Sequence, residues 1–393
     1  MSDNFRFTSA LPGISRFIMM IFFAVFPRLL LAPLLLRISA DLQIGYSTAS
    51  SFFLSSSAGF ATGLVISGFI AHLLTHRWTI ICGAFLTGSM LLSLSVVQSV
   101  PLFHLFMFFL GFSNGLYHGS GIASVARTVP DAFRGRALAF HETGPNMAFI
   151  LAPILSALLA PHIGWRGVFA ATGFAAMGAG LLFALTHRGP SERSDPPHFR
   201  NLKLFASIPA YWTLLLLLAI ATSLLYGAFS VLPTFLAIEH NLPEAFLNNL
   251  IGMSRIAGFF TIFAAGYLAD RLGFRVVLAT ILIFTGGLTM LIGVLSGKIL
   301  LVTVFLQPMI TQSFFPVAFG AITRLARPAA RNLAISLAIP FSNLIGGGLA
   351  PPLITAAGAA GYFGLGFVVL GATAVLSTLL LLLLPSTISD RSL

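Results

Sequence analysis

Three charged side chains lie deep inside apolar stretches of the sequence: Arg28, Glu142 and Arg255. A charge near the centre of a lipid bilayer costs at least about 2–3 kcal/mol, so such residues usually bind a substrate, carry a proton or control gating. An arginine keeps its proton and pairs with carboxylates and phosphates, whereas a glutamate in apolar surroundings can take up and release a proton. The arginines therefore predict anion binding, and Glu142 is a candidate proton carrier.

A structural explanation is also open for each of the three. Arg28 lies between Pro27 and Pro33, and prolines free backbone carbonyl groups that an arginine can bind. Glu142 could form an ion pair that stabilises the start of a helix, and its partner could be Arg255. We favour substrate contact for both arginines and leave the two roles of Glu142 open.

Polar residues recur at helical spacing near these charges. Asn248 precedes Arg255 by seven positions, which places both on one face of a helix. Asn114, Tyr117 and His118 share a face of another helix by the same rule. These residues predict a polar surface beside the buried charges.

A histidine beside a carboxylate can hold a proton near physiological pH, so His118, His141 and Glu142 are candidates for proton coupling or gating. A histidine that forms only structural hydrogen bonds explains the same pattern. Tyr226 and Gln307 lie in later apolar segments and suggest a pocket of mixed polar and aromatic character. The candidate substrate-binding residues are Arg28, Asn114, Tyr117, Tyr226, Asn248, Arg255 and Gln307.

The composition is that of a polytopic membrane protein. Of the 393 residues 57% are hydrophobic and 8% are charged, too few polar groups to cover a soluble protein of this length. The mean hydropathy is +0.98. The net charge of +11 does not indicate nucleic-acid binding, because the basic residues do not cluster. They recur in short loops between apolar segments.

About 20 apolar residues are needed for a helix to cross the hydrocarbon core. This length predicts twelve transmembrane helices, starting near Ile14, Tyr46, Trp78, Pro101, Ala137, Trp165, Tyr211, Ala245, Val276, Ile299, Asn332 and Gly361. Twelve such helices predict an all-α membrane protein. A polar stretch after the sixth span predicts that the chain is divided into an N-terminal bundle at 1–186, a cytoplasmic linker at 187–205 and a C-terminal bundle at 206–393. Most of the 21 Lys and Arg residues fall in alternate loops, which predicts cytoplasmic N- and C-termini in the cell (inner) membrane.

The two halves share a repeated motif. Gly68-Phe-Ile-Ala-His-Leu73 is followed 198 positions later by Gly266-Tyr-Leu-Ala-Asp-Arg271. With Arg275, the second copy resembles the signature loop of the major facilitator superfamily, as do Arg134-Gly-Arg-Ala137 and Gly164-Trp-Arg-Gly-Val-Phe169. The resemblance implies two pseudo-symmetric six-helix bundles, and it implies that Asp270, Arg271 and Arg275 form a conformational lock.

The sequence departs from the superfamily pattern at two positions. His72 stands where the signature has an Asp, and Met107 stands where proton antiporters of the family carry an Arg. The second departure argues against a standard drug/proton antiporter. Leu116-Tyr-His118 is similar to fosmidomycin-resistance-like exporters, whereas Arg255 resembles the arginine of oxalate/formate and monocarboxylate carriers.

The sequence therefore predicts a secondary active transporter of a small organic anion, a carboxylate above all, with proton symport as a secondary hypothesis. Efflux of a drug or metabolite is the alternative, and a non-transporting membrane sensor or assembly factor is a second one. No nucleotide-binding, catalytic or metal-ligand motif occurs, so we expect neither an enzyme nor a cofactor or metal. The expected partners are the anionic substrate, the lipid bilayer and protons, without nucleic acid, and we expect a monomer.

Overall fold

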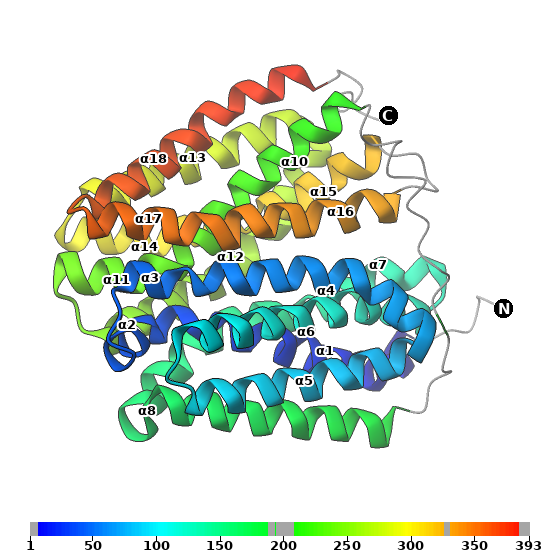
Figure 1. Cartoon of the computed structure of the whole chain (residues 1–393). Helices are drawn as coiled ribbons and strands as arrows, with labels where there is room; N and C mark the ends of the chain where they lie inside the picture. The colour runs from blue at the N-terminus through cyan, green and yellow to red at the C-terminus, as the bar shows by residue number, and fades with distance from the viewer. Residues whose placement is uncertain (1–6, 188–192, 194–207, 326–330, 385–393) are drawn as a thin grey trace. The chain divides into compact units, whose positions relative to one another are not determined.

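The computed structural model describes residues 7–187, 193, 208–325 and 331–384, and within these ranges all regular structure is helical (Figure 1). A helix satisfies its own backbone hydrogen bonds, as a chain that crosses a bilayer requires. Large apolar side chains such as Phe174 and Leu353 are exposed, where lipid would contact them. The predicted all-α membrane fold is confirmed.

Ten described segments are long and apolar enough to cross a membrane. The longest, Arg134–Thr186, holds two spans, because Gly164 interrupts it with a positive φ of 67°. Helix α12 (Glu244–Leu272) adds a further segment of spanning length that carries several charges. The described segments are consistent with the twelve predicted spans.

The described residues form two compact units. The first lies within Met1–Ile38 and Ser55–Pro197, and the second within Ser39–Leu54 and His198–Leu393. The predicted linker, 187–205, lies outside the described residues apart from positions 187 and 193. The division of the chain into bundles at that linker stays a prediction.

The first residues of the second predicted span, from Tyr46 to Leu54, belong to the second unit. The ring of Tyr46 stacks on Phe363 with centroids 5.6 Å apart. The hydroxyl groups of Ser50 and Thr355 are hydrogen-bonded at 2.5 Å. These contacts join this short segment to the last two spans.

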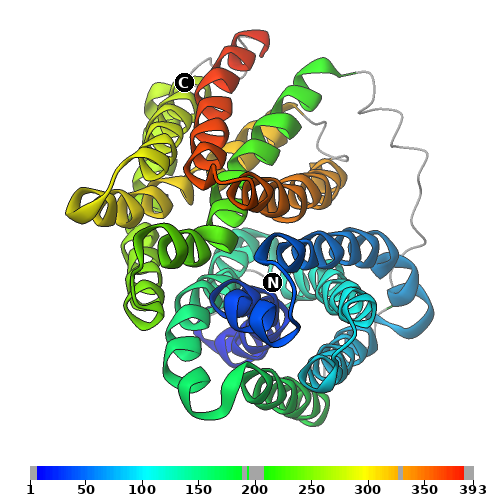
Figure 2. The same cartoon turned by 60° about the vertical axis from the view of Figure 1, so that its left-hand side comes forward.

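The first unit is built from the helices of the first six predicted spans, and α1 lies in the middle of them (Figure 2). Helices α4 and α6 are in backbone contact, because a Cβ at Gly59 or Gly111 would lie 1.8 Å from a carbonyl oxygen of the other helix. The elements are α1 (Phe7–Leu29), α2 (Leu31–Asp41), α4 (Phe52–Leu74), α5 (His76–Val96), α6 (Val100–Arg127), η1 (Asp131–Phe133), α7 (Arg134–His141) and α8 (Thr143–Thr186).

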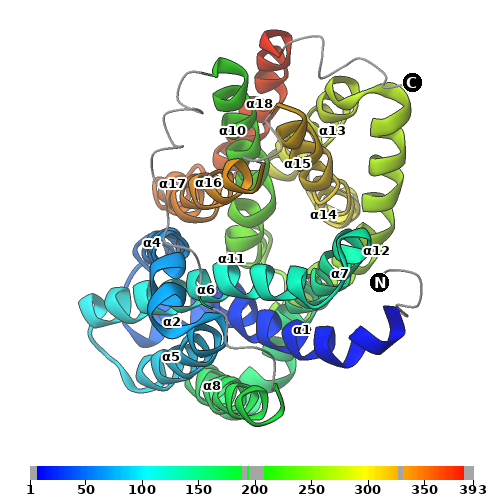
Figure 3. The same ribbon diagram turned by 90° about the vertical axis from the view of Figure 1, so that its right-hand side faces the viewer.

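The second unit contains several spans that are broken or widened along their length. Figure 3 shows α14 and α15 as two pieces of one bent span beside α12 and α13. Two segments, η3 and η5, are π-helical. Besides α12 the elements are α3 (Tyr46–Ser50), α10 (Pro209–Thr222), η3 (Ser223–Gly227), α11 (Ala228–His240), α13 (Phe274–Val294), α14 (Gly297–Thr311), α15 (Phe314–Leu325), α16 (Arg331–Asn343), η5 (Leu344–Leu349), α17 (Ala350–Ala359), α18 (Phe363–Ser377) and η6 (Thr378–Leu383).

The internal repeat reappears as a matching contact in the two units. At the start of α5, Arg77 Nη2 donates to the carbonyl oxygen of Ala184 near the end of α8, at 2.6 Å. At the start of α13, Arg275 donates to the carbonyl oxygen of Leu384, just after η6. An arginine at such a place satisfies a carbonyl group that a helix end leaves free.

Candidate functional site

Arg28 lies in the last turn of α1 and is only 5% exposed. Pro27 lies inside the same helix, which ends one residue after Arg28. The Nη2 atom of Arg28 donates a hydrogen bond to Ser57 Oγ of α4 at 2.6 Å. A hydroxyl group orients the guanidinium without neutralising it, and such an arginine is suited to bind a carboxylate.

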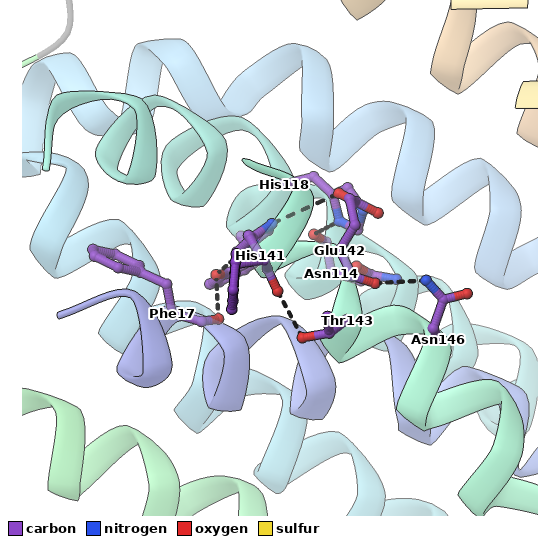
Figure 4. Close-up of polar contacts among 9 residues, drawn as sticks. Phe17, Asn114, His118, His141, Glu142, Thr143 and Asn146 are labelled. Carbon is purple, nitrogen blue, oxygen red and sulfur yellow. Dashed lines mark hydrogen bonds and ion pairs between the residues drawn. The ribbon is translucent and has the colours of Figure 1, made fainter. Parts of the chain in front are cut away.

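A buried hydrogen-bond chain joins three helices of the first unit (Figure 4). The Tyr117 hydroxyl of α6 donates to the backbone oxygen of Phe17 in α1 at 2.8 Å. The same hydroxyl lies 2.9 Å from Nε2 of His141, at the end of α7. The Tyr117 and His141 rings are stacked, 5.9 Å between centroids. Both side chains are almost fully buried.

The direction of this chain fixes which nitrogen of His141 carries a proton. A carbonyl oxygen can only accept, so the single hydroxyl proton of Tyr117 is directed at Phe17. The hydroxyl oxygen must then accept from His141, which requires a proton on Nε2. A neutral His141 therefore has its lone pair on Nδ1.

Glu142 is placed against that second nitrogen. Its Oε1 lies 3.6 Å from His141 Nδ1, and the Glu142 side chain is 60% exposed, whereas that of His141 is fully buried. A lone pair facing a carboxylate is repulsive, and one added proton on either atom makes the contact attractive. The pair can thus hold one proton between a buried ring and an exposed carboxylate.

The junction of α7 and α8 holds Glu142 in place. The backbone oxygen of Glu142 accepts a hydrogen bond from Asn146 Nδ2 at 2.8 Å. Thr143 Oγ1 donates to the Phe140 oxygen at 2.6 Å. Gly144 brings α8 against α1, since a Cβ there would lie 2.8 Å from the Ile18 oxygen. This close approach also positions α1 for the contact with Tyr117.

His118 is the other histidine among the proton-coupling candidates. Nδ1 of His118 lies 3.2 Å from the Asn114 oxygen of its own helix, and its ring packs edge-on against Phe60. Arg28, His141 and Glu142 are its electrostatic neighbours. The structure thus gathers the ionisable candidates of the first unit into one cluster, in which His141 contacts the carboxylate.

Arg255 lies in the middle of α12 and is 4% exposed. Its Nη2 donates to the Leu225 oxygen at 3.5 Å, and its guanidinium lies over the Phe229 ring, 5.0 Å from the centroid. Tyr226 is an electrostatic neighbour. The second unit therefore surrounds this arginine with a carbonyl group and aromatic rings from η3 and α11.

The π-helix η3 explains why carbonyl groups are available there. A π-helix widens the turn and changes the i→i+4 pattern, and such segments are frequent at functional sites. Leu224 O accepts from Gln307 Nε2 at 3.0 Å, as Leu225 O accepts from Arg255. Gly346 of η5 packs on η3, because a Cβ there would lie 2.4 Å from the Ser223 nitrogen.

The remaining polar candidates of the second unit differ in how they are bound. Gln307 Nε2 also donates to Thr289 Oγ1 at 3.2 Å, so its amide is held in place. Asn248 is 3% exposed, and its Oδ1 has no hydrogen-bond partner among the described residues. In the first unit, Asn114 Oδ1 is likewise without such a partner within the described ranges. Both oxygens are available to a ligand.

A groove in the second unit lies apart from this site. It has a volume of about 540 Å³ and an apolar lining. Arg255 is not among the lining residues. Two of them, Met253 and Ile256, are exposed apolar side chains of α12. The groove therefore opens on the apolar outer side of α12, which lipid would contact. Its lining residues are Met253, Ile256, Ala257, Thr261, Ala264, Phe305 and Met309.

The residues of the signature loop lie at the end of α12 and the start of α13. Asp270 and Arg271 are exposed, and Arg271 lies over the Tyr267 ring, 4.6 Å from its centroid. Arg275 is engaged by the carbonyl group of Leu384 within the second unit. A lock formed by these residues stays a prediction.

Several contacts could not be read from the sequence. Ser57 and the backbone oxygen of Phe17 lie far along the chain from the side chains that they bind. The π-helices had no recognisable signal beyond the glycines on which they pack. Among the described residues, no group of three His, Cys, Asp or Glu side chains is placed to hold a metal ion.

Two curated proteins of similar sequence are named as transport proteins. A putative metabolite transport protein of Haemophilus influenzae is 26% identical over 268 residues, which is 63% of this chain and 64% of that protein. The chain thus spans less than two thirds of that relative. The cis,cis-muconate transport protein of Acinetobacter baylyi is 25% identical over 355 residues, 85% of this chain and 84% of that protein.

Solved structures of similar fold are also transporters. A bacterial homolog to the human lysosomal transporter Spinster, in an inward-facing and occupied conformation, has a TM-score of 0.82 at 14% identity, covering 96% of this chain and 97% of that one. A POT family transporter in complex with 5-aminolevulinic acid has a TM-score of 0.78 at 15% identity, covering 96% and 97%. At these identities the likeness concerns the fold alone. Residues 17–306 match the Major Facilitator Superfamily, so the chain belongs to that family.

Proposed function

We propose that the protein is a secondary active transporter of a small organic anion, with a carboxylate as its charged group, that works by alternating access. The observation that carries the proposal is the burial of Arg28 and Arg255, at 5% and 4% exposure, in helices of a membrane transporter. Neither guanidinium can shed its proton. An anionic group that binds such a charge compensates for its transfer out of water.

The surroundings of Arg255 support this role. Its hydrogen bond to the Leu225 oxygen is long, at 3.5 Å, so a carboxylate that replaced it with shorter paired bonds would lose little. The Phe229 ring lies against the guanidinium and limits how it can turn. The related muconate transport protein of Acinetobacter baylyi supports the same class, because muconate is a dicarboxylate.

Uptake into proteoliposomes tests the proposal, with labelled cis,cis-muconate and a panel of short mono- and dicarboxylates as substrates. Truncating one partner of a buried charge pair costs about 2–5 kcal/mol, so Arg255→Gln should raise KM about 30-fold or more. The matched control is Arg166→Gln, which removes the same charge from contacts with the Ser95 and Val97 oxygens. A KM for Arg255→Gln equal to that of the parent would refute the arginine role. If no carboxylate is carried and overexpression confers drug resistance, the efflux alternative is supported.

We propose further that the His141–Glu142 pair couples transport to one proton. The support for this proposal is geometric: a buried ring nitrogen lies 3.6 Å from an exposed carboxylate, and a symport step needs a proton site of this kind. An imposed pH gradient should then drive uptake by the parent. Glu142→Gln should abolish this drive while exchange of substrate across the membrane continues. Glu239→Gln, at an exposed position in the last turn of α11, is the control.

The same proposal places the chain in the cell (inner) membrane with cytoplasmic termini, as a monomer of two six-helix bundles joined by residues 187–205. The distribution of Lys and Arg supports this orientation. Cys82 is the only cysteine, so a Cys82→Ser background allows single cysteines to be placed in that linker or beside Lys298. A membrane-impermeant maleimide added outside should label the second position and not the first. Light scattering on the purified protein tests the monomer.

A further inference from the structure

Gln312 lies where the tenth span is broken, between the end of α14 at Thr311 and the start of α15 at Phe314. Its side chain is 8% exposed. Its Oε1 accepts no hydrogen bond from any residue that the structure describes. A buried acceptor without a partner is rare in proteins and calls for an explanation such as a missing ligand.

The amide of Gln312 packs against Gly258 of α12. A Cβ at Gly258 would lie 2.9 Å from Nε2 and 3.3 Å from Oε1 of Gln312, so only glycine leaves the amide this close to the helix. Gly258 follows Arg255 by three positions, which puts both on one face of α12, with about 5–6 Å between neighbouring positions. The unfilled oxygen therefore packs on the same face of α12 as the proposed carboxylate-binding arginine, about one turn further along the helix.

The residues around Gln312 hold the broken span in place and leave the amide as the adaptable group. Thr261 Oγ1 donates to the Met309 oxygen at 2.5 Å and accepts from Ser313 Oγ at 3.0 Å. These bonds attach both sides of the break to α12. The backbone nitrogen of Gln312 donates to the Pro308 oxygen at 3.4 Å, so its backbone is tied to the end of α14.

We propose that Gln312 determines substrate specificity by accepting a hydrogen bond from a hydroxyl group of an organic anion whose carboxylate binds Arg255. This inference rests on the proposed function. An ammonium group could also donate to Gln312, but the positive charge of Arg255 on the same face of α12 disfavours it. A 2-oxo acid offers only an acceptor in the same place. The substrate class is therefore a short hydroxycarboxylate.

Isothermal titration of the purified full chain in detergent micelles tests the assignment with matched acids: malate against succinate, and lactate against propionate and pyruvate. The parent should bind each hydroxy acid about tenfold more tightly than its analogue, a factor that corresponds to about 1.4 kcal/mol. In Gln312→Leu the affinity for each hydroxy acid should fall to that for the matching deoxy acid, and the affinity for the deoxy acids should equal that of the parent. Gly258→Ala displaces the amide and should reduce the preference as well. Thr303→Val of α14, whose hydroxyl donates to the Ile299 oxygen of its own helix, should keep the preference.

Each outcome has a distinct meaning. A parent that binds the acids without preferring the hydroxyl group, or that prefers the oxo acid, overturns the role of Gln312 and leaves the proposed function intact. The same follows if Gln312→Leu keeps the preference. If the parent binds no carboxylate, the proposed function fails and this inference fails with it. Weakened binding of every acid in Arg255→Gln, together with loss of the preference in Gln312→Leu and its retention in Thr303→Val, supports both.

Discussion

Replacing Tyr117 by phenylalanine removes one oxygen atom from the buried chain between Phe17 and His141. The Nε2 proton of His141, whose side chain is fully buried, then has no acceptor at that position. A buried donor left unsatisfied costs about 1–3 kcal/mol, so Tyr117→Phe should be destabilised by about that amount. The ring can recover part of the loss by moving its proton to Nδ1, 3.6 Å from Glu142 Oε1.

This change of tautomer has a consequence for transport. With the proton on Nδ1, a neutral imidazole donates to the carboxylate, and the pair no longer needs an added proton to attract. Tyr117→Phe should therefore carry substrate with a weaker dependence on the pH gradient, besides melting at a lower temperature.

Uptake by proteoliposomes over a range of imposed gradients, with thermal melting of the same preparations, measures both effects. The control is Tyr267→Phe, an exposed tyrosine whose ring stays over Arg271 when the hydroxyl is removed. Tyr117→Phe with the melting temperature and gradient dependence of the parent would refute the reasoning. A lower melting temperature with an unchanged gradient dependence would leave Tyr117 a structural role only.

Three further predictions concern packing, a helix end and pH. Gly111→Ala puts a Cβ 1.8 Å from the Ser56 oxygen and should prevent α4 and α6 from packing, whereas Gly178→Ala, in open space on α8, should express and melt like the parent in detergent. Arg275→Gln removes a charged donor from the end of η6 and should cost about 1.5–3 kcal/mol, measured by urea titration, with Arg275→Lys restoring part of it. Burial lowers the pKa of His187 from 6.5, and nearby arginines lower it further. Neutral His187 therefore stabilises the folded state above pH 6.5, and this contribution is lost as the pH falls below that value. His187→Phe should therefore show a smaller drop in melting temperature between about pH 8 and about pH 5, and an equal drop would contradict this.

Of the three charges that the sequence places in apolar stretches, Arg28 and Arg255 are buried and Glu142 is 60% exposed, and their partners could not be predicted. Burial of Arg28 and Arg255 follows from their place in apolar stretches, because a helix that crosses lipid must carry its whole sequence with it. The contact of Glu142 with His141, rather than with His118, depends on a break between α7 and α8 at Glu142. A shift of one residue in that break would turn the carboxylate by about 100° around the helix axis.

The sequence by itself determined the membrane class, the positions of the spans and the family, because hydropathy over about 20 residues and the local i→i+4 hydrogen bonds are properties of each segment alone. Only the tertiary structure decided which polar groups meet. Tyr117 reaches a carbonyl oxygen 100 positions away, and Gln312 reaches α12 because Gly258 has no side chain. Such contacts depend on the depth and rotation of each helix, which are set by close packing at glycines between segments that are distant in the chain.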